Sequence, residues 1–146
     1  MGEVRLGIVG VGAMGHSYAE RVRDGAIDRM RLSAVCDRSP ERVAGFDDVP
    51  RFDDAEKMFH SGLIDAAVIA TPHPSHRVIG VAALKAGLHT LVEKPLTVTA
   101  ADSARLLDAH RDTSTVFAAM FNQRMDPRYI RCSAPSSPEV MSSRRW

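Results

Sequence analysis

The stretch VRLGIVGVGAMG, residues 4–15, places a short apolar run directly before three glycines spaced as G-x-G-x-x-G. The run over 4–10 is typical of a strand that is buried on both faces of a parallel sheet. A helix is expected to follow from about Ala13 to Arg23. Strand, glycine-rich turn and helix in this order form the context in which the motif binds a dinucleotide, so the stretch predicts an α/β domain.

The glycine-rich turn has a separate mechanical reason for each of its glycines. Gly10 permits the tight turn, Gly12 lets the backbone approach a pyrophosphate, and Gly15 lets the helix pack closely on the strand. Ala13 and Met14 complete the turn, where free backbone N–H groups and the helix dipole attract phosphate charge. We therefore expect the whole turn to bind the cofactor.

The next expected strand, over 31–37, ends in Asp37, which lies 22 residues after Gly15. An acid at this position can accept hydrogen bonds from the ribose hydroxyls of NAD, and it should repel the 2′-phosphate of NADP. The neighbouring Arg38 could instead pair with that phosphate. The sequence therefore favours NAD, leaves NADP open, and places both residues at the cofactor.

Strands and helices alternate at short spacing along most of the chain. This alternation predicts a doubly wound, Rossmann-type parallel sheet with helices on both faces, joined by right-handed crossovers. The further strands are expected within 49–54, 65–71, 89–93 and 114–121. The predicted single domain covers residues 1–125, and the Ser- and Pro-rich segment 126–146 is expected to be a linker or poorly ordered tail.

Four of the expected helices begin at a residue that can cap them. Ser39, which precedes Pro40, and Ser75 are both interpreted as N-caps. An aspartate is expected to cap the helix over 54–61, and TAAD (99–102) resembles a capping box. These residues set the predicted helix starts.

The bulk composition is that of an ordinary globular protein, with 45% hydrophobic residues, 25% charged residues and a formal net charge of +1. The low net charge predicts no nucleic-acid partner, and the lack of an apolar run of about 18 residues predicts no membrane segment. No signal peptide is recognised, and Cys36 and Cys132 suggest neither a disulfide framework nor a metal site. We therefore expect a cytoplasmic protein that binds no metal.

Three polar segments are expected to follow strands at one edge of the sheet: TPHPSH (71–76), EKP (93–95) and FNQR (121–124). Ligands bind beyond the carboxyl ends of the strands in open parallel sheets, so the segments predict one shared cleft. Thr71 and Pro72 should line this cleft beside the nicotinamide ribose.

Lys94 of the EKP segment is the candidate for proton chemistry. A lysine at a strand end that faces a partly dry cleft can hydrogen-bond a substrate hydroxyl and take part in its proton transfer. The alternative is a surface lysine in an ordinary ion pair with Glu93. The Lys94–Pro95 bond could be cis, which would fix an abrupt turn. His73 is interpreted as a surface or capping residue.

Five segments together resemble the N-terminal domain of the glucose–fructose oxidoreductase / inositol dehydrogenase (Gfo/Idh/MocA) family. They are GIVGVGAMG, CDRSPER, DAAVIATPHPSH, AGLHTLVEKPLTVTAADSARLL and MFNQRMDPRY, which together span about residues 4–130. The resemblance implies an NAD(P)-dependent oxidoreductase that acts on a sugar, cyclitol or related polyol, with Lys94 as the catalytic lysine. The residues implied to hold the cofactor or border the active site are Gly10, Gly12, Gly15, Asp37, Thr71, Pro72, His76, Glu93 and Asn122.

The sequence departs from the family pattern in two ways. His73 stands where the family often has an asparagine. Members of the family also continue into a second α/β domain, which provides most substrate contacts, the partners of the catalytic lysine and the usual oligomer interface. The resemblance therefore implies a truncated member that binds NAD(H) weakly and does not turn over polyols alone. A non-catalytic NAD(H)-binding module and a decayed remnant are the alternatives, and apolar surface near 115–130 is expected to favour self-association.

Overall fold

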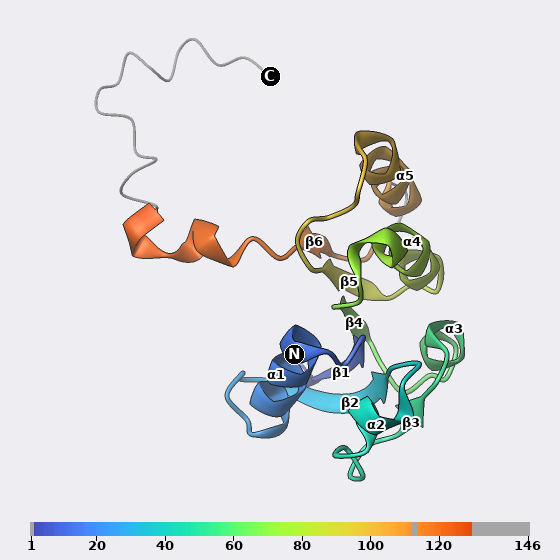
Figure 1. The fold of residues 1–146 in the computed structure, drawn as a ribbon, viewed down its shortest axis with the longest axis vertical. Helices are drawn as coiled ribbons and strands as arrows, with labels where there is room; N and C mark the ends of the chain where they lie inside the picture. Colours follow the sequence, from blue (N-terminus) through green and yellow to red (C-terminus); the bar gives the residue numbers. More distant parts are fainter. Residues whose placement is uncertain (1, 112–113, 130–146) are drawn as a thin grey trace.

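The strand Val4–Val9 (β1) lies inside a six-stranded parallel sheet with the order β3-β2-β1-β4-β5-β6 (Figure 1). The computed structural model with this arrangement describes residues 2–111 and 114–129. The other strands are β2 (Met30–Cys36), β3 (Arg51–Phe52), β4 (Ala66–Ile69), β5 (His89–Val92) and β6 (Phe117–Ala119). All neighbouring strands pair in parallel, which confirms the predicted doubly wound, Rossmann-type sheet.

Helices connect the successive strands, as parallel pairing requires. Their bounds are α1 (Ala13–Arg23), α2 (Pro40–Val43), α3 (Ala55–Phe59), α4 (His76–Lys85) and α5 (Ala100–His110). Two 3₁₀ turns, η1 (His73–Ser75) and η2 (Asn122–Met125), follow β4 and β6. Most of the tail predicted over 126–146 lies outside the described residues.

The two faces of the sheet bury separate apolar clusters. Leu6 and Ile8 of β1 belong to one cluster, together with Ala19 of α1. Val9 belongs to the other cluster, together with Met58 of α3. Because successive residues of β1 are buried on opposite faces, the strand needs the continuous apolar sequence from which it was predicted, and helices cover both faces.

Two of the predicted helix caps are confirmed. The Asp54 carboxylate accepts a hydrogen bond from the Lys57 N–H at 3.0 Å, at the start of α3. The Thr99 hydroxyl oxygen accepts one from the Asp102 N–H at 3.1 Å, at the start of α5. Each contact satisfies a backbone N–H group that has no partner within its own helix.

Ser39 and Ser75 lie at the predicted N-cap positions of α2 and α4, with Pro40 in the first turn of α2, but neither side chain forms a capping hydrogen bond. The Ser39 hydroxyl donates to the Glu41 carboxylate at 2.5 Å instead of accepting a backbone hydrogen bond. The Ser75 hydroxyl lies 2.8 Å from the Thr71 hydroxyl and 2.7 Å from the Pro72 carbonyl oxygen. Ser75 ends η1 with helical φ and ψ, so its side chain points back along the turn and not towards the first turn of α4.

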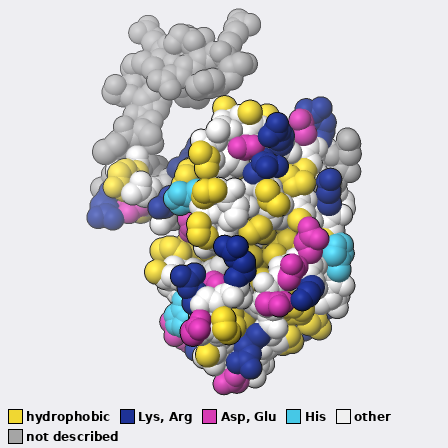
Figure 2. Space-filling model, turned by 45° about the vertical axis from the view of Figure 1, so that its right-hand side comes forward, with side chains coloured by type: hydrophobic (Ala, Val, Ile, Leu, Met, Phe, Trp, Pro, Cys, Tyr) yellow, Lys and Arg dark blue, Asp and Glu magenta, His cyan; other side chains and the backbone are white. Residues whose placement is uncertain are grey.

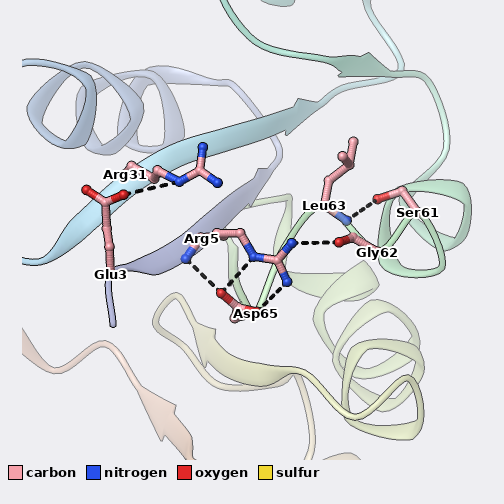
Figure 3. Close-up of polar contacts among 7 residues, drawn as sticks. All are labelled: Glu3, Arg5, Arg31, Ser61, Gly62, Leu63 and Asp65. Carbon is pink, nitrogen blue, oxygen red and sulfur yellow. Dashed lines mark hydrogen bonds and ion pairs between the residues drawn. The ribbon is translucent and has the colours of Figure 1, made fainter. Parts of the chain in front are cut away.

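Arg5 and Asp65 join the amino ends of β1 and β4, on the side of the sheet opposite to the carboxyl ends of the strands (Figure 3). Arg5 Nη2 lies 2.6 Å from Asp65 Oδ1, and both Nε and the backbone N–H of Arg5 donate to Oδ2 at 3.0 Å. Arg5 Nη1 also donates to the Gly62 carbonyl oxygen at 2.8 Å. Hydrogen bonds from Arg5 lower the pKa of Asp65 to about 2.

Candidate dinucleotide cleft

A cavity of about 620 Å³ opens beyond the ends of β1, β2, β4 and β5, which is a typical size for a ligand site. It lies where the strand order reverses between β1 and β4, the usual place for a ligand in an open α/β sheet. The predicted site residues that line it are Gly10, Gly12, Ala13, Met14, Asp37, Arg38, Thr71, Pro72, Glu93 and Lys94. The structure brings these residues together, and it places Gly15, His76 and Asn122 outside the cavity lining.

The glycines of the turn differ in their surroundings. Gly10 has a φ of +88°, and a Cβ there would lie 2.7 Å from the Thr71 backbone nitrogen. A Cβ on Gly15 would lie 1.9 Å from the Gly10 carbonyl oxygen, so the backbone closes both positions to larger residues. Gly12 has no atom within 4 Å of its Cβ position, and it lines the cleft. The open space therefore lies at the glycine that the motif assigns to the pyrophosphate.

The Asp37 carboxylate faces the glycine-rich turn from the end of β2. Its Oδ2 accepts a hydrogen bond from the Val11 N–H at 2.8 Å, and its Oδ1 accepts one from the Ser39 N–H at 2.9 Å. The Arg42 guanidinium lies 3.5 Å from Oδ2, and the Asp37 side chain is only 8% exposed. The carboxylate is therefore held firmly at this end of the cleft, with part of its charge balanced.

The sequence reasoning missed several charged residues on this side of the cleft. Arg42 lines it from α2, and Asp53 and Asp54 line it from the segment between β3 and α3. Burial raises the pKa of the Cys36 thiol to about 12, and nearby carboxylates add to this effect. Those carboxylates belong to Asp54, Asp37 and Asp53, so three acids act on the Cys36 thiol from this end of the cleft. The pairing of Cys36 in β2 with Phe52 in β3 brings Asp53 and Asp54 near Asp37. No local sequence pattern predicts this pairing.

His76, the first residue of α4, is fully buried behind the wall of the cleft. Its ring Nε2 lies 2.7 Å from the Thr71 carbonyl oxygen, and Nδ1 lies 3.0 Å from the Pro95 carbonyl oxygen. Thr71 follows β4 and Pro95 follows β5, so the imidazole links the ends of two neighbouring strands. The sequence assigned His76 to the cofactor, whereas the structure places it beneath the segments that line the cleft.

Glu93 is buried at the end of β5, with 6% of its surface exposed. Its Oε1 accepts a hydrogen bond from the Tyr18 hydroxyl of α1, and its Oε2 accepts one from the Lys94 backbone N–H at 2.8 Å. Burial and then the hydrogen bond to Glu93 raise the pKa of Tyr18 to about 12, so the phenol remains a donor at neutral pH. Tyr18 was not predicted, because its partner is 75 residues away in the sequence.

Lys94 is exposed and lines the cleft, and the Lys94–Pro95 bond is cis. In the part of the chain that the structure describes, its ammonium forms no ion pair with Glu93. The Glu93 carboxylate instead bonds the backbone of Lys94. The ordinary Glu93–Lys94 ion pair that the sequence left open as an alternative is therefore absent from the described residues.

Two further residues of the polar segments lie at the margin. Asn122 begins η2 and is exposed, and its side-chain oxygen accepts a hydrogen bond from the Gln123 N–H at 3.0 Å. His73, interpreted from the sequence as a surface or capping residue, is exposed in η1 and lines the cleft. Its ring centroid lies 5.5 Å from that of His76. Unlike His73, Asn122 is not part of the cavity lining.

Within residues 2–111 and 114–129, no three side chains of His, Cys, Asp or Glu converge in a way that could hold a metal ion. Across the same described ranges, no helix is long and apolar enough to cross a membrane. Cys132 lies outside these ranges.

A glycine-rich turn between a parallel strand and a helix, an acid at the end of the second strand and a cleft at the carboxyl edge of the sheet define a dinucleotide-binding domain of the Rossmann class. Residues 4–121 match the family described as "Oxidoreductase family, NAD-binding Rossmann fold" (GFO_IDH_MocA). This match covers most of the chain, so the chain belongs to that oxidoreductase family and contains its NAD-binding domain. The family resemblance predicted from the five segments is confirmed.

Several relatives of the chain are inositol dehydrogenases. The chain is 34% identical to "Inositol 2-dehydrogenase 4" of Saccharopolyspora erythraea over 132 residues, which cover 87% of this chain and 39% of the relative. It is 32% identical over 131 residues to an inositol 2-dehydrogenase of Corynebacterium glutamicum, of which it also covers 39%. The chain therefore spans about two fifths of the length of these relatives.

The fold is similar to that of solved dehydrogenases. The structure of scyllo-inositol dehydrogenase from Lactobacillus casei with bound NAD(H) and scyllo-inositol matches with a TM-score of 0.79 at 26% identity, over 89% of this chain and 39% of that one. The same enzyme without ligand matches with a TM-score of 0.82 at 25% identity, over 90% of this chain and 40% of that one. These TM-scores show that the chain shares the fold of the matching part of these dehydrogenases.

Proposed function

We propose that the cleft holds NAD(H) and that the chain supplies the dinucleotide-binding half of a dehydrogenase for a cyclitol, sugar or related polyol. The observation that carries the proposal is the open space at Gly12, at the start of α1 and on the cleft wall. The first N–H groups of α1 lack partners within the helix, and they attract phosphate. Asp37 then receives the adenosine ribose, while Thr71 and Pro72 border the nicotinamide end.

The reaction is assigned from Lys94 and from the names of the relatives. A bound nicotinamide would supply the hydride acceptor or donor. Oxidation of an alcohol also removes the hydroxyl proton, and the neutral amine of Lys94, which lines the cleft, is the group that would take up that proton. Glu93 supports it by bonding the Lys94 backbone at 2.8 Å. The inositol dehydrogenases among the relatives favour a cyclitol as the substrate.

The chain spans 39% of the length of these relatives. Catalysis needs a substrate held in near-attack geometry, and the described cleft supplies one side of such a site. We therefore expect the 146-residue chain to bind NAD(H) weakly and not to oxidise polyols by itself.

Calorimetric titration of the chain with NAD⁺, NADH and NADP⁺ tests the cofactor. We expect measurable binding of NAD⁺ and NADH and weaker binding of NADP⁺, because the Asp37 carboxylate repels a 2′-phosphate. Absence of binding to all three would contradict the proposal, and tighter binding of NADP⁺ would contradict the role of Asp37. Steady production of NADH from myo-inositol by the chain alone would contradict the expected lack of turnover.

We also propose that copies of this chain associate with one another through exposed apolar side chains. Val116, Phe121 and Tyr129 are 63%, 48% and 50% exposed. In Figure 2, hydrophobic side chains lie among basic and acidic ones over the face shown. Exposed apolar surface favours association, so light scattering at rising concentration should detect species larger than a monomer. A constant monomer mass at high concentration would contradict this part of the proposal.

A further inference from the structure

Tyr18 lies between the helix of the glycine-rich turn and the EKP segment. We propose that Tyr18 is a positioning residue: its hydroxyl holds the Glu93 carboxylate away from the Lys94 ammonium, and so leaves the ammonium free to meet a ligand hydroxyl. This inference rests on the proposed function for its meaning. Its physical content concerns only these three side chains.

The carboxylate oxygens of Glu93 are each bonded by a hydrogen-bond donor other than the Lys94 ammonium. A buried carboxylate is costly unless hydrogen-bond donors or a cation satisfy its oxygens. Three donors are close along the chain or across the fold: the Tyr18 hydroxyl, the Lys94 backbone N–H and the Lys94 ammonium. The first two bond Oε1 and Oε2, one oxygen each. Both oxygens of Glu93 are therefore satisfied without the ammonium.

The Lys94 ammonium belongs to the residue next to Glu93, so it is a competing donor for the Glu93 carboxylate. Glu93 and Lys94 are consecutive residues, and both line the same cleft. A lysine side chain is long and flexible, so the position of Lys94 in the chain does not fix the position of its ammonium. The contact that keeps Oε1 occupied is the one from Tyr18.

The Tyr18 hydroxyl remains a hydrogen-bond donor to Glu93 at neutral pH. Burial and the hydrogen bond to Glu93 raise its pKa to about 12, so the hydroxyl keeps its proton and stays a donor. Tyr18 lies on α1 three residues after Gly15, and it packs against the cluster on that face of the sheet. Its position is set by the same helix that begins at the phosphate-binding turn.

Pairing with Glu93 would make the Lys94 ammonium less available to a ligand. An ammonium that is paired with a carboxylate must lose that pair before it can bond a ligand, and its neutral amine form becomes rarer. If Tyr18 loses its hydroxyl, Oε1 loses that donor, and the ammonium of the adjacent residue Lys94 can take its place. Tyr18→Phe should therefore move Glu93 into an ion pair with Lys94.

Trace acetylation of the purified chain with acetic anhydride tests this, because only a neutral amine reacts. The chain has three lysines, so the acetylation of Lys94 can be measured by mass spectrometry against that of exposed Lys85. We expect Tyr18→Phe to slow Lys94 relative to Lys85 by about two- to fivefold, the range that a modest ion pair supports. The double variant Tyr18→Phe/Glu93→Gln should restore the wild-type ratio, since no carboxylate remains.

Two comparisons separate positioning from a structural role. Tyr129→Phe, at the other tyrosine, should leave the Lys94 ratio unchanged. Damage to the fold in Tyr18→Phe would change Lys57 as well, which is held by Asp53 at 3.1 Å, and Glu93→Gln would not reverse it. An unchanged Lys94 ratio in Tyr18→Phe, or a slowed ratio that Glu93→Gln does not restore, would overturn the proposal.

Glu93→Gln alone keeps the test decisive if Tyr18→Phe does not fold. Because Glu93 and Lys94 are not paired in the wild-type chain, this variant should raise Lys94 acetylation by no more than about twofold. A larger increase would mean that the pair exists in solution, and it would overturn the proposal. The experiment uses no cofactor or substrate, so its failure would leave the proposed NAD(H) binding untouched, and absent NAD(H) binding would not alter its result.

Discussion

The Asp37 carboxylate accepts a hydrogen bond from the Val11 N–H at 2.8 Å, which joins the end of β2 to the glycine-rich turn after β1. Its other oxygen accepts one from the Ser39 N–H at 2.9 Å. Each carboxylate oxygen carries two lone pairs, so Asp37 can hold the turn and still accept ribose hydroxyls. One side chain therefore shapes the cleft and, under the proposed function, also selects the ligand.

Asp37→Asn separates these two tasks. The amide keeps the size and one acceptor oxygen, but it loses the charge that should discriminate between NAD and NADP. We expect NAD⁺ affinity to fall about tenfold, which corresponds to one strong hydrogen bond, while NADP⁺ affinity falls less or rises. Calorimetry with both nucleotides measures the ratio, with Asp28→Asn, an exposed aspartate outside the cleft lining, as the matched control. An unchanged NAD⁺ to NADP⁺ ratio would count against Asp37.

Gly12→Ala and Gly15→Ala should have opposite effects on stability and binding. A Cβ at Gly12 meets no atom within 4 Å, so the free energy of unfolding should change by only about 1 kcal/mol, as for other changes at a helix N-cap. The methyl group would nevertheless occupy the space expected for the pyrophosphate, so NAD⁺ binding should be lost. A Cβ at Gly15 would lie 1.9 Å from the Gly10 carbonyl oxygen. This variant should lose about 3 kcal/mol or more.

Urea denaturation and NAD⁺ titration of both glycine variants check this pair of outcomes. If Gly12→Ala bound NAD⁺ as tightly as the wild-type chain, the phosphate would not lie at this turn. If Gly15→Ala were as stable as the wild type, the close approach between the start of α1 and Gly10 would be wrong.

The ion pair between Arg5 and Asp65 should make the domain sensitive to acid. Hydrogen bonds from Arg5 lower the pKa of Asp65 from 3.8 to about 2 in the folded state. The resulting stability is fully present above about pH 4 and is lost as the pH falls towards 2. Both side chains are more than a third exposed, at 36% and 40%, so solvent screening limits the effect to about 1 kcal/mol or less.

Urea denaturation at pH 6 and pH 2.5 measures this contribution. Asp65→Asn should be less stable than the wild type at pH 6, and the difference should shrink at pH 2.5. A constant difference between the two pH values would show that the charge of Asp65 does not contribute. Asp28→Asn, which is exposed, should follow the wild-type pH dependence.

Local patterns predicted the parts of the structure that neighbouring residues determine. The continuous apolar run of β1 and the spacing of Gly10, Gly12 and Gly15 placed the first strand, the turn and the start of α1, because these constraints act within a dozen residues. The capping residues Asp54 and Thr99 were predicted for the same reason. Ser75 takes its predicted position before α4, but its hydroxyl bonds Thr71 and makes no capping bond, because Ser75 also ends η1, a turn that the sequence did not indicate.

The parts that could not be predicted depend on packing between distant segments. Tyr18 has the pattern of one more residue of an amphipathic helix, and only the folded sheet brings it to Glu93, which follows β5. His76 was assigned to the cofactor because it lies in a polar segment at a strand end. Its full burial follows from the way α4 sits against the ends of β4 and β5, which periodicity does not specify.

Tyr18 should also affect stability at high pH. Its pKa rises from 10.0 to about 12 on folding, so its contribution is fully present below pH 10 and is lost as the pH rises from 10 towards 12. The Cys36 thiol also has its pKa raised, to about 12, so it also makes the domain less stable at high pH. This effect is the same in the wild type and in Tyr18→Phe. Tyr18→Phe should therefore lose less stability than the wild type between pH 9 and pH 11.5. Urea denaturation at these two values measures the difference, and equal losses would contradict the buried hydroxyl.

The buried His76 gives the last prediction. Its two ring nitrogens lie 2.7 Å and 3.0 Å from the carbonyl oxygens of Thr71 and Pro95. His76→Leu removes the imidazole N–H between these two strand ends, and a buried acceptor that loses its donor costs about 1–3 kcal/mol. His76→Gln keeps an amide that can donate to at least one of them, so it should lose less stability than His76→Leu. His60→Gln, at an exposed histidine, should be close to the wild type.

The same variants distinguish a role in the cleft from a role beneath it. If His76 only ties Thr71 to Pro95, His76→Gln should recover NAD⁺ affinity and stability together, because both depend on the position of the two loops. If the imidazole touched the cofactor directly, His76→Gln would regain stability without regaining affinity. Urea denaturation and NAD⁺ calorimetry on the three variants give this comparison. Because His76 is fully buried and absent from the cleft lining, we expect the two quantities to recover together.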